Sequence, residues 1–336
     1  MTYRFVYRRY GLPFRLPVRT AHGLWTRREG LFVRLETEQG NVGYGECAPL
    51  ASFGTETVDG AEEILRGWGR TVTDEQMGAV PANFGCLRFA LGAARALQRA
   101  GETPMTPYLP VAALLPAGRL ALPQISPKAE IGFRTFKWKV GVGDLADELG
   151  LLDDLIAKLP SGGKLRLDAN GAWDRRQAER WLERCAERPI EFVEQPIAPG
   201  AKGAIDLLMG LTGDYPTPVA LDESIAQAGE ILAWLDRGWR GIFVVKPLLL
   251  GDYGPVLARL QKEKAAVVFS SALETGIGAR AALQIAFCFG GETRALGFGV
   301  WPLFVDSRFD GPYIAPFVRK EDVERIDPEA LWTALS

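Results

Sequence analysis

The sequence predicts an α/β protein in which a (β/α)₈, TIM-like barrel carries an N-terminal α+β cap. Five apolar segments of the chain each end in a charged residue, and these ends recur at intervals of about 24 to 29 residues, roughly one strand–turn–helix–turn unit. The apolar runs are short and nearly continuous, as in parallel strands that are buried on both faces. The N-terminal part lacks this repeat and has the pattern of strands followed by helices.

The N-terminal strands and helices form the predicted cap. Residues 3–10 alternate in polarity, and two further apolar runs flank the tripeptide QGN at 39–41, which is a hairpin signal. Residues 57–69 and 85–100 are predicted to be helices, the second with apolar side chains along one face.

Eight apolar runs are predicted to be the barrel strands. They span residues 111–115, 135–140, 164–168, 191–195, 218–222, 241–246, 266–270 and 295–299. Helical patterns lie between them, and eight such parallel units close into a barrel. The first unit is irregular, because Pro123 and Pro127 leave room only for a short helix capped by Ser126.

No barrel strand remains for the C-terminal segment, which we expect to pack back on the cap. The predicted division of the chain is therefore 1–109 for the cap, 110–302 for the barrel with the active site, and 303–336 for this segment.

Composition narrows the class of protein. The chain has 336 residues, of which 47% are hydrophobic and 24% charged, and a net charge of −2. This balance argues against nucleic acid or an anionic membrane as the partner. The four cysteines form no CxxC pair and are expected to be buried thiols. The N-terminus lacks a signal-peptide apolar core and no run reaches transmembrane length, so we expect a cytoplasmic protein.

Three acidic residues are predicted to hold a metal ion. Asp168, Glu194 and Asp222 each follow an apolar run, on the third, fourth and fifth predicted strands. Carboxyl ends of barrel strands meet at the functional rim. Three carboxylates without an imidazole favour a hard cation such as Mg²⁺, with Mn²⁺ as a plausible substitute, over zinc. Ordinary loop acids or salt-bridge partners are the alternative, but charge at buried strand ends is costly unless it is paired.

Lysines flank these acids on both sides. Lys137 and Lys139 alternate on the second strand, so both point inward with Trp138 opposite. Their mutual repulsion and burial are expected to lower their pKa values, which suits a base. Lys246 ends the sixth strand across the barrel mouth, and its apolar neighbours indicate burial rather than a surface position.

These motifs together resemble the muconate-lactonizing subgroup of the enolase superfamily. The resemblance rests on KxK at 137–139, DAN at 168–170, EQP at 194–196, DES at 222–224 and Lys246, and it extends to GYGECAPL in the cap. The segments FKWKVGV, RLDANGAW and SSALETGIG most resemble those of subgroup members that dehydrate a cyclohexadiene carboxylate in menaquinone or phylloquinone synthesis. The resemblance implies a small-molecule carboxylate substrate and a carbon–oxygen lyase. The oligomeric state is left open, a monomer included.

The resemblance also implies roles for single residues. Asp168, Glu194 and Asp222 would bind Mg²⁺, with Lys139 as the acid–base residue and Lys246 as the opposing cation. Residues expected to support the site are Lys137, Arg166 and Asn170.

Other residues are expected to contact the substrate. Ser270 and Ser271 either donate hydrogen bonds to it or cap the following helix. A loop at 19–30 with Thr20 and His22, and a second segment at 51–57, are expected to cover the barrel mouth as lids.

Three other functions are compatible with parts of this pattern. Dipeptide epimerases of the subgroup usually have an acidic pair on the eighth strand, and this chain has ALGFGVWPLFVD there instead. N-succinylamino acid racemase activity stays open, since it uses the same two lysines. A non-catalytic barrel that binds a metal and a carboxylate would be expected to lack one of the lysines or acids, and all are present.

Overall fold

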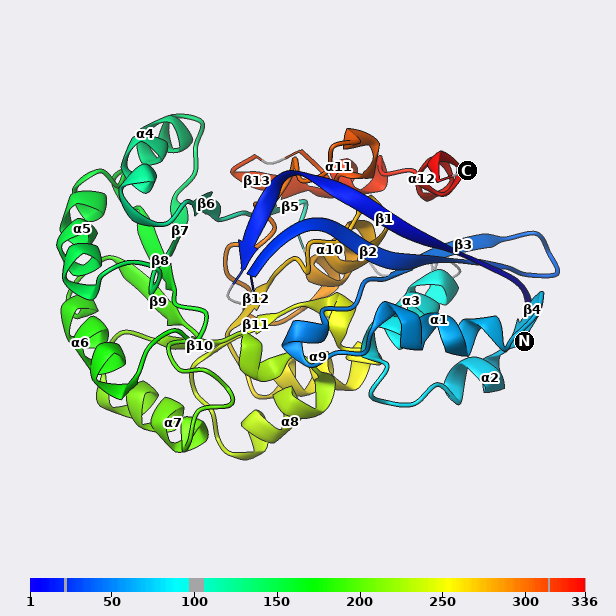
Figure 1. The fold of residues 1–336 in the computed structure, drawn as a ribbon, viewed down its shortest axis with the longest axis horizontal. Helices are drawn as coiled ribbons and strands as arrows, with labels where there is room; N and C mark the ends of the chain where they lie inside the picture. Colours follow the sequence, from blue (N-terminus) through cyan, green and yellow to red (C-terminus); the bar gives the residue numbers. More distant parts are fainter. Residues whose placement is uncertain (21–22, 97–105, 314, 336) are drawn as a thin grey trace.

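The cap is built on a four-stranded antiparallel sheet with helices against it (Figure 1). The computed structural model describes residues 1–20, 23–96, 106–313 and 315–335. The sheet has the order β3-β2-β1-β4. Its strands are β1 (Thr2–Thr20), β2 (Gly23–Glu36), β3 (Val42–Cys47) and β4 (Thr71–Thr73). The helices are α1 (Val58–Arg66), α2 (Asp74–Gly78) and α3 (Gly85–Ala96).

The hairpin predicted around residues 39–41 is confirmed, since β2 and β3 pair and the Thr37 amide donates to the Asn41 carbonyl at 2.9 Å. The loop predicted at 19–30 is wrong in its secondary structure. Residues 19–20 and 23–30 continue β1 and β2, with Thr20 paired to Gly23. These residues are extended because β1 and β2 pair with each other along this stretch. The sequence of one strand alone does not reveal that pairing.

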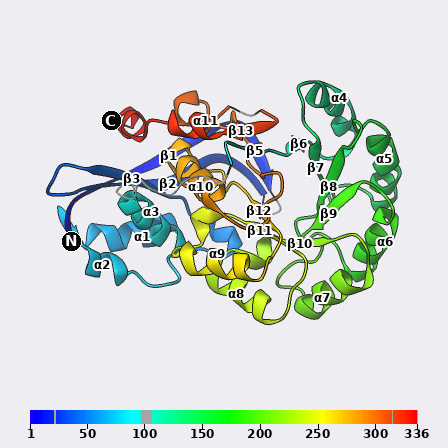
Figure 2. The same cartoon turned by 180° about the vertical axis from the view of Figure 1, so that it is seen from behind.

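Seven parallel strands form the barrel sheet, in the chain order β6 to β12 across the sheet. They are β6 (Ala113–Leu115), β7 (Thr135–Lys139), β8 (Lys164–Asp168), β9 (Ile190–Glu194), β10 (Val219–Leu221), β11 (Ile242–Val245) and β12 (Val267–Phe269). Helices cover the outside of this sheet (Figure 2). They are α4 (Leu122–Glu130), α5 (Leu145–Ala157), α6 (Arg175–Cys185), α7 (Ala204–Asp214), α8 (Ala228–Asp236), α9 (Tyr253–Lys262) and α10 (Gly276–Cys288).

The eighth predicted strand, 295–299, is instead a set of isolated bridges. Leu296 bridges to Val111 and Gly297 bridges to Ser270, both in parallel. This segment therefore joins the two edges of the sheet and closes the barrel. A Cβ atom at Gly297 would collide with the Ser270 hydroxyl, so the close approach requires glycine and leaves the ladder short.

The first barrel helix also differs from the prediction. Helix α4 begins at Leu122, with Pro123 in its first turn and Pro127 inside it, so Ser126 is not its cap. Pro123 is tolerated because the first-turn N–H groups have no partner within a helix. Pro127 removes one internal hydrogen bond, which this short helix sustains with Ile125 fully buried beneath it.

The C-terminal segment contacts the cap, as Figure 1 shows. Phe14 in β1 bridges to Phe304, and the Arg8 guanidinium lies 4.4 Å from the ring centre of Trp332. Strand β13 (Phe317–Arg319) pairs with β5 (Tyr108–Pro110). This small sheet therefore connects the predicted C-terminal segment with the predicted boundary between cap and barrel. Helices α11 (Lys320–Glu324) and α12 (Pro328–Ala334) follow. The division into three parts stays a prediction.

Three of the four cysteines are buried and Cys288 is half-buried. Burial raises the pKa of Cys185 to about 12. Within the described ranges, no helix has the length and apolar character needed to cross a membrane.

A buried carboxylate joins the cap to the barrel. Glu46, at the end of β3, is fully buried and accepts hydrogen bonds from the Tyr10 hydroxyl at 2.6 Å and the Gly278 amide at 2.8 Å. The hydroxyl of Thr275, the residue that caps α10, donates to it at 2.5 Å. A carboxylate at a helix N-terminus also interacts favourably with the helix dipole. Glu46 thereby fixes the start of α10 against the cap sheet.

We expect Glu46→Ala to lower the free energy of unfolding by about 3–5 kcal/mol, since it leaves several buried donors without an acceptor. Glu46→Gln keeps one acceptor oxygen, so we expect a smaller loss. Urea unfolding of both variants measures this. A loss below about 1 kcal/mol for the alanine variant, the range of an ordinary surface change, would contradict the role.

Candidate active site

A cavity of about 260 Å³ lies at the carboxyl-terminal ends of the barrel strands, beneath the β1–β2 hairpin. Its polar lining comes from the barrel, namely Lys137, Lys139, Asp168, Asn170, Asp222, Glu223, Lys246, Ser270 and Ser271. The cap contributes an apolar cover of Val18, Trp25, Leu50 and Phe53. The predicted second lid segment, 51–57, thus reaches the cavity through Phe53.

The three predicted metal ligands stand on neighbouring strands. Asp168 ends β8, Glu194 ends β9 in register with it, and Asp222 directly follows β10. All three side chains are nearly buried. Parallel pairing therefore gathers acids that lie far apart in the sequence at one rim of the barrel.

Two lysines form ion pairs with these three acids. The Lys137 ammonium lies 2.9 Å from Asp168 Oδ2 and 2.7 Å from Glu194 Oε1, and Lys246 forms an ion pair with Asp222. Burial opposes the charge on Lys137, but the two carboxylates outweigh it and raise the lysine pKa above its usual value. The prediction that repulsion and burial lower the pKa is wrong for Lys137, because the two carboxylates in contact with it outweigh both effects. Burial does lower the pKa of Lys246, to about 7.

The acids fit a hard divalent cation by their chemistry. Burial, and then the nearby Asp168 charge, raise the pKa of Glu194, and a cation between these carboxylates would offset that repulsion. Lys137 already places one positive charge there. As the side chains stand, no three Asp, Glu, His or Cys residues within the described ranges are grouped closely enough to hold a metal. A cation bound by Asp222 would compete with Lys246 for the charge of that carboxylate.

Lys139 reaches the same cavity from β7, two residues beyond Lys137. Trp138 between them is fully buried on the other face, where it meets Trp181 of α6 with ring centres 6.2 Å apart. The alternation predicted for this strand is therefore confirmed. It directs both lysines into the barrel mouth.

Two supporting residues were not predicted. Gln195 accepts hydrogen bonds from the amides of Asp222 at 2.9 Å and Ser224 at 3.1 Å, so it fixes the backbone that carries a predicted ligand. Glu223 accepts from the Asn170 side chain at 2.9 Å, and burial, then the Asp168 charge, raise its pKa to about 7. Their only signal in the sequence is their position beside the acids, in EQP and DES.

Asn170 and Gln195 both have positive φ, at 45° and 38°. Such backbone conformations are uncommon outside glycine and gather at functional sites. Gln195 directly follows the end of β9, and Asn170 lies two residues after the end of β8. Both strands end in a predicted ligand, and the chain leaves the sheet at these points.

The two serines form one wall of the cavity. Ser270 donates to the Gly297 carbonyl at 3.2 Å, and Ser271 donates to Glu274 Oε2 at 2.9 Å. Neither caps α10, since Thr275 holds that position, so the capping alternative is wrong. Fully buried Glu274 also accepts from the Ala272 amide at 2.6 Å and thereby shapes this wall.

Glu274 should make stability depend on pH. Burial, and then the neighbouring Glu46 charge, raise its folded-state pKa to about 7 from 4.5. Between about pH 4.5 and 7 the folded protein therefore keeps a proton on Glu274 that the unfolded chain releases. The contribution of this raised pKa to the free energy of unfolding is lost as pH rises through that range. In metal-free buffer, we expect the stability advantage of wild type over Glu274→Gln to shrink by about 2–3 kcal/mol between pH 5 and pH 8.

Urea unfolding of the two proteins at pH 5, 6, 7 and 8 measures that difference. Subtracting the variant cancels the titrating groups that do not interact with Glu274. Lys246 does interact with it, since burial lowers the Lys246 pKa and the Glu274 charge partly offsets that lowering, so the difference includes that smaller change as well. A difference that is constant with pH would contradict a raised pKa at Glu274.

Three further predicted residues are Arg166, Thr20 and His22. Arg166 is buried deeper in the barrel, where it pairs with Glu191 at 2.7 Å, and does not line the cavity. Thr20 ends β1 and His22 lies outside the described residues.

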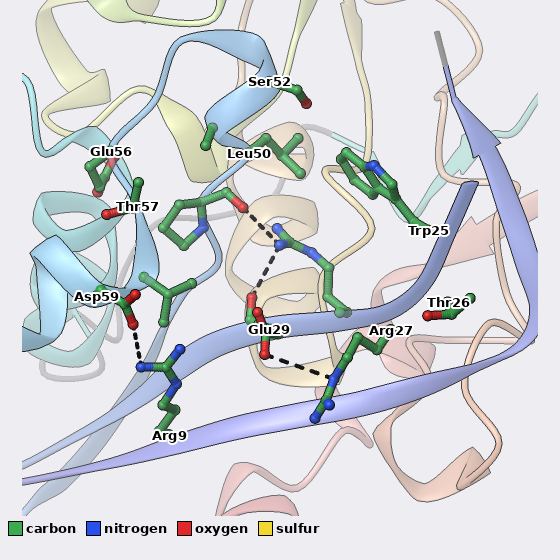
Figure 3. Close-up of a pocket in the computed structure, with 14 residues that line it drawn as sticks. Arg9, Trp25, Thr26, Arg27, Glu29, Leu50, Ser52, Glu56, Thr57 and Asp59 are labelled. Carbon is green, nitrogen blue, oxygen red and sulfur yellow. Dashed lines mark hydrogen bonds and ion pairs between the residues drawn. The ribbon is translucent and has the colours of Figure 1, made fainter. Parts of the chain in front are cut away.

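A second cavity, of about 510 Å³, borders the hairpin (Figure 3). Its charged lining includes the ion pairs of Arg9 with Asp59 at 2.6 Å and of Arg27 with Glu29 at 3.8 Å. Trp25 and Leu50 line both cavities and so form the wall between them. None of the predicted acids and lysines lines the larger cavity, so we place the chemistry in the smaller one.

Comparison with known proteins agrees with this architecture. A family model for "MenC, N-terminal domain" matches residues 1–97, and one for "Enolase C-terminal domain-like" matches residues 124–315. The o-succinylbenzoate synthase of Thermosynechococcus vestitus is 42% identical over 304 residues, 88% of this chain and 92% of that protein. The hydrophobic dipeptide epimerase of Roseobacter litoralis is 31% identical over 65% of this chain and 67% of its own length.

A solved structure is also similar over nearly the whole chain. The o-succinylbenzoate synthase from Thermosynechococcus elongatus BP-1, complexed with Mg in the active site, gives a TM-score of 0.82 at 37% identity and covers 98% of this chain and 99% of that one. Fold and site thus define a capped, enolase-like barrel enzyme. Within that class, the chain belongs to the o-succinylbenzoate synthase family.

Proposed function

We propose that this protein is a Mg²⁺-dependent carbon–oxygen lyase that dehydrates 2-succinyl-6-hydroxy-2,4-cyclohexadiene-1-carboxylate to 2-succinylbenzoate, in menaquinone or phylloquinone synthesis. One observation carries the proposal: Lys139 and Lys246 line a single cavity with two of the three strand-end acids. The similarity to o-succinylbenzoate synthases over most of the chain supports it. We propose Mn²⁺ as a substitute for Mg²⁺.

Asp168, Glu194 and Asp222 would hold the cation. When bound, it supplies positive charge beside the substrate carboxylate and makes the adjacent α proton more acidic. Lys137, paired with Asp168 and Glu194, stays protonated and orients those two ligands. Gln195 holds the backbone of Asp222 in place.

Lys139 performs the proton transfers in this proposal. Its unprotonated Nζ takes the α proton, and the electrons of that C–H bond enter the ring as the C–O bond to the hydroxyl breaks. Lys139 then gives the same proton to the departing hydroxide, so water leaves on the same face and the ring becomes aromatic. The Lys246 ammonium stabilises the negative charge that develops meanwhile.

The remaining predicted residues would bind the substrate or support the residues of the site. Ser270 and Ser271 line the cavity and would donate hydrogen bonds to the succinyl group if their hydroxyls turned from the Gly297 carbonyl and Glu274 toward the substrate. Asn170 would orient Glu223, and Arg166 would brace the barrel interior below the ligands. Substrate contacts of Thr20 and His22 stay predictions.

N-succinylamino acid racemisation is the second candidate, because the same cavity presents a lysine from β7 and another from beyond β11. The two reactions require different properties of Lys246. Racemisation needs its proton for the face opposite Lys139, whereas dehydration needs only its charge. Lys246→Arg preserves the charge and removes proton transfer.

We therefore expect Lys246→Arg to abolish racemisation while part of the dehydration survives. Misplacement of the substrate by about 1 Å can itself lower the rate roughly 100-fold, so both rates are measured in the same variant and compared as a ratio. α-Proton exchange with inversion reports racemisation, and loss of diene absorbance reports dehydration. Equal losses in both would show that Lys246 does not have these distinct roles.

A further inference from the structure

The cap places an aromatic ring on one of the barrel lysines. The Lys246 ammonium lies 4.8 Å from the ring centre of Phe53, and both side chains line the small cavity. The charged groups of that cavity come from the barrel, whereas Phe53 comes from the cap. An ammonium within about 6 Å of a ring centre is attracted by the electron-rich face of the ring.

The backbone that carries Phe53 is held in a tight turn. The Phe53 amide donates to the Leu50 carbonyl at 2.7 Å, and the Gly54 amide donates to the Ala51 carbonyl at 3.0 Å. Gly54 ends this turn at φ 83°, a left-handed conformation that favours glycine. The position of the half-buried ring is therefore set by local geometry rather than by a long free loop.

The barrel also holds this turn. Gln227 donates from its side-chain amide to the Gly54 carbonyl at 2.8 Å. Gln227 follows the short helical turn Glu223–Ile225, which begins directly after Asp222. The same stretch of barrel that carries a proposed metal ligand therefore also fixes the cap residue that covers Lys246.

An aromatic ring and a carboxylate have different effects on a catalytic ammonium group. Asp222 pairs with Lys246 in the structure, but as a metal ligand it would share its negative charge with the cation. The face of Phe53 attracts the ammonium without bringing a full negative charge, so the lysine keeps its positive field toward the substrate. The ring also has no atom that could take the lysine proton.

We propose that Phe53 is a positioning residue that holds the Lys246 ammonium in place once Asp222 binds the metal ion. This inference rests on the proposed function, because it concerns the lysine that stabilises the developing charge. It assigns the cap a direct part in the chemistry, in addition to covering the cavity.

The test replaces Phe53 with phenylalanines that carry one, two or three ring fluorines, introduced at this position alone. Each fluorine weakens the negative face of the ring while nearly preserving its shape. We expect kcat for dehydration to fall with each added fluorine, by about 2- to 30-fold in total, the range that corresponds to a cation–π contact. Phe53→Leu should lose a similar factor and Phe53→Trp should retain most of the rate.

The matched control carries the same fluorines at Phe317, an exposed ring on β13. Its rates should stay level, and thermal unfolding should show that all fluorinated proteins fold. If wild type dehydrates the substrate but the Phe53 series is flat, this inference is overturned and the proposed function stands. If wild type does not dehydrate the substrate, the proposed function itself fails. Should Phe53→Leu not fold, the fluorinated series still decides the matter.

Discussion

Lys139→Ala should remove nearly all dehydration while the protein stays folded. A general acid–base group contributes about 10²–10⁴-fold to a rate, and here one lysine would serve as base and then as acid, so we expect a loss at or beyond the upper end. Lys139→Arg should fail as well, because a guanidinium stays protonated and cannot take the α proton. Steady-state kinetics on both variants with saturating Mg²⁺ measures the effect.

Lys164→Ala is the matched control for this substitution. Lys164 is an exposed lysine at the opposite end of β8, far from the cavity lining. We expect its variant to keep the wild-type rate. A Lys139→Ala protein that retains more than about a tenth of the wild-type kcat would exclude Lys139 as the acid–base residue.

Removal of the metal should abolish turnover altogether. A chelator should stop the reaction and added Mg²⁺ or Mn²⁺ should restore it, because three carboxylates without an imidazole make a site for a hard cation. Asp222→Asn should weaken Mg²⁺ binding strongly, since it removes the negative charge of one of the three proposed ligands. Calorimetric titration of apo protein with Mg²⁺ measures the affinity without reference to turnover.

Asp214→Asn, at an exposed acid at the end of α7, is the control for a general charge effect. Its Mg²⁺ affinity should match that of wild type. Restoration of turnover by Zn²⁺ alone, or an unchanged affinity in Asp222→Asn, would show that the carboxylates are not the metal site we propose.

Much of the barrel follows from local sequence patterns. Each predicted ligand comes at or just after the end of an apolar run, so strand position and strand end are encoded within a few residues. Parallel pairing then brings Asp168 and Glu194 into register, which the barrel geometry enforces once the strands are assigned.

Features that depend on distant contacts were not predictable in this way. Glu46 accepts hydrogen bonds from Thr275, which caps α10, and from Gly278 in its first turn, 229 and 232 positions away, and no local pattern identifies such partners. Glu274 likewise has no separate signal, although it shapes the cavity wall. The raised pKa of Lys137 depends on contacts with Asp168 and Glu194 from two other strands, and the spacing of lysines within one strand does not reveal those contacts.

The most direct measurement is the dehydration assay itself. Purified protein is mixed with Mg²⁺ and 2-succinyl-6-hydroxy-2,4-cyclohexadiene-1-carboxylate, and the diene absorbance is followed beside racemisation of an N-succinylamino acid. We expect the absorbance to fall with formation of 2-succinylbenzoate, at a kcat/KM well above that for racemisation. No consumption of the diene, or a higher kcat/KM for racemisation, would contradict the assignment of this site as a dehydratase.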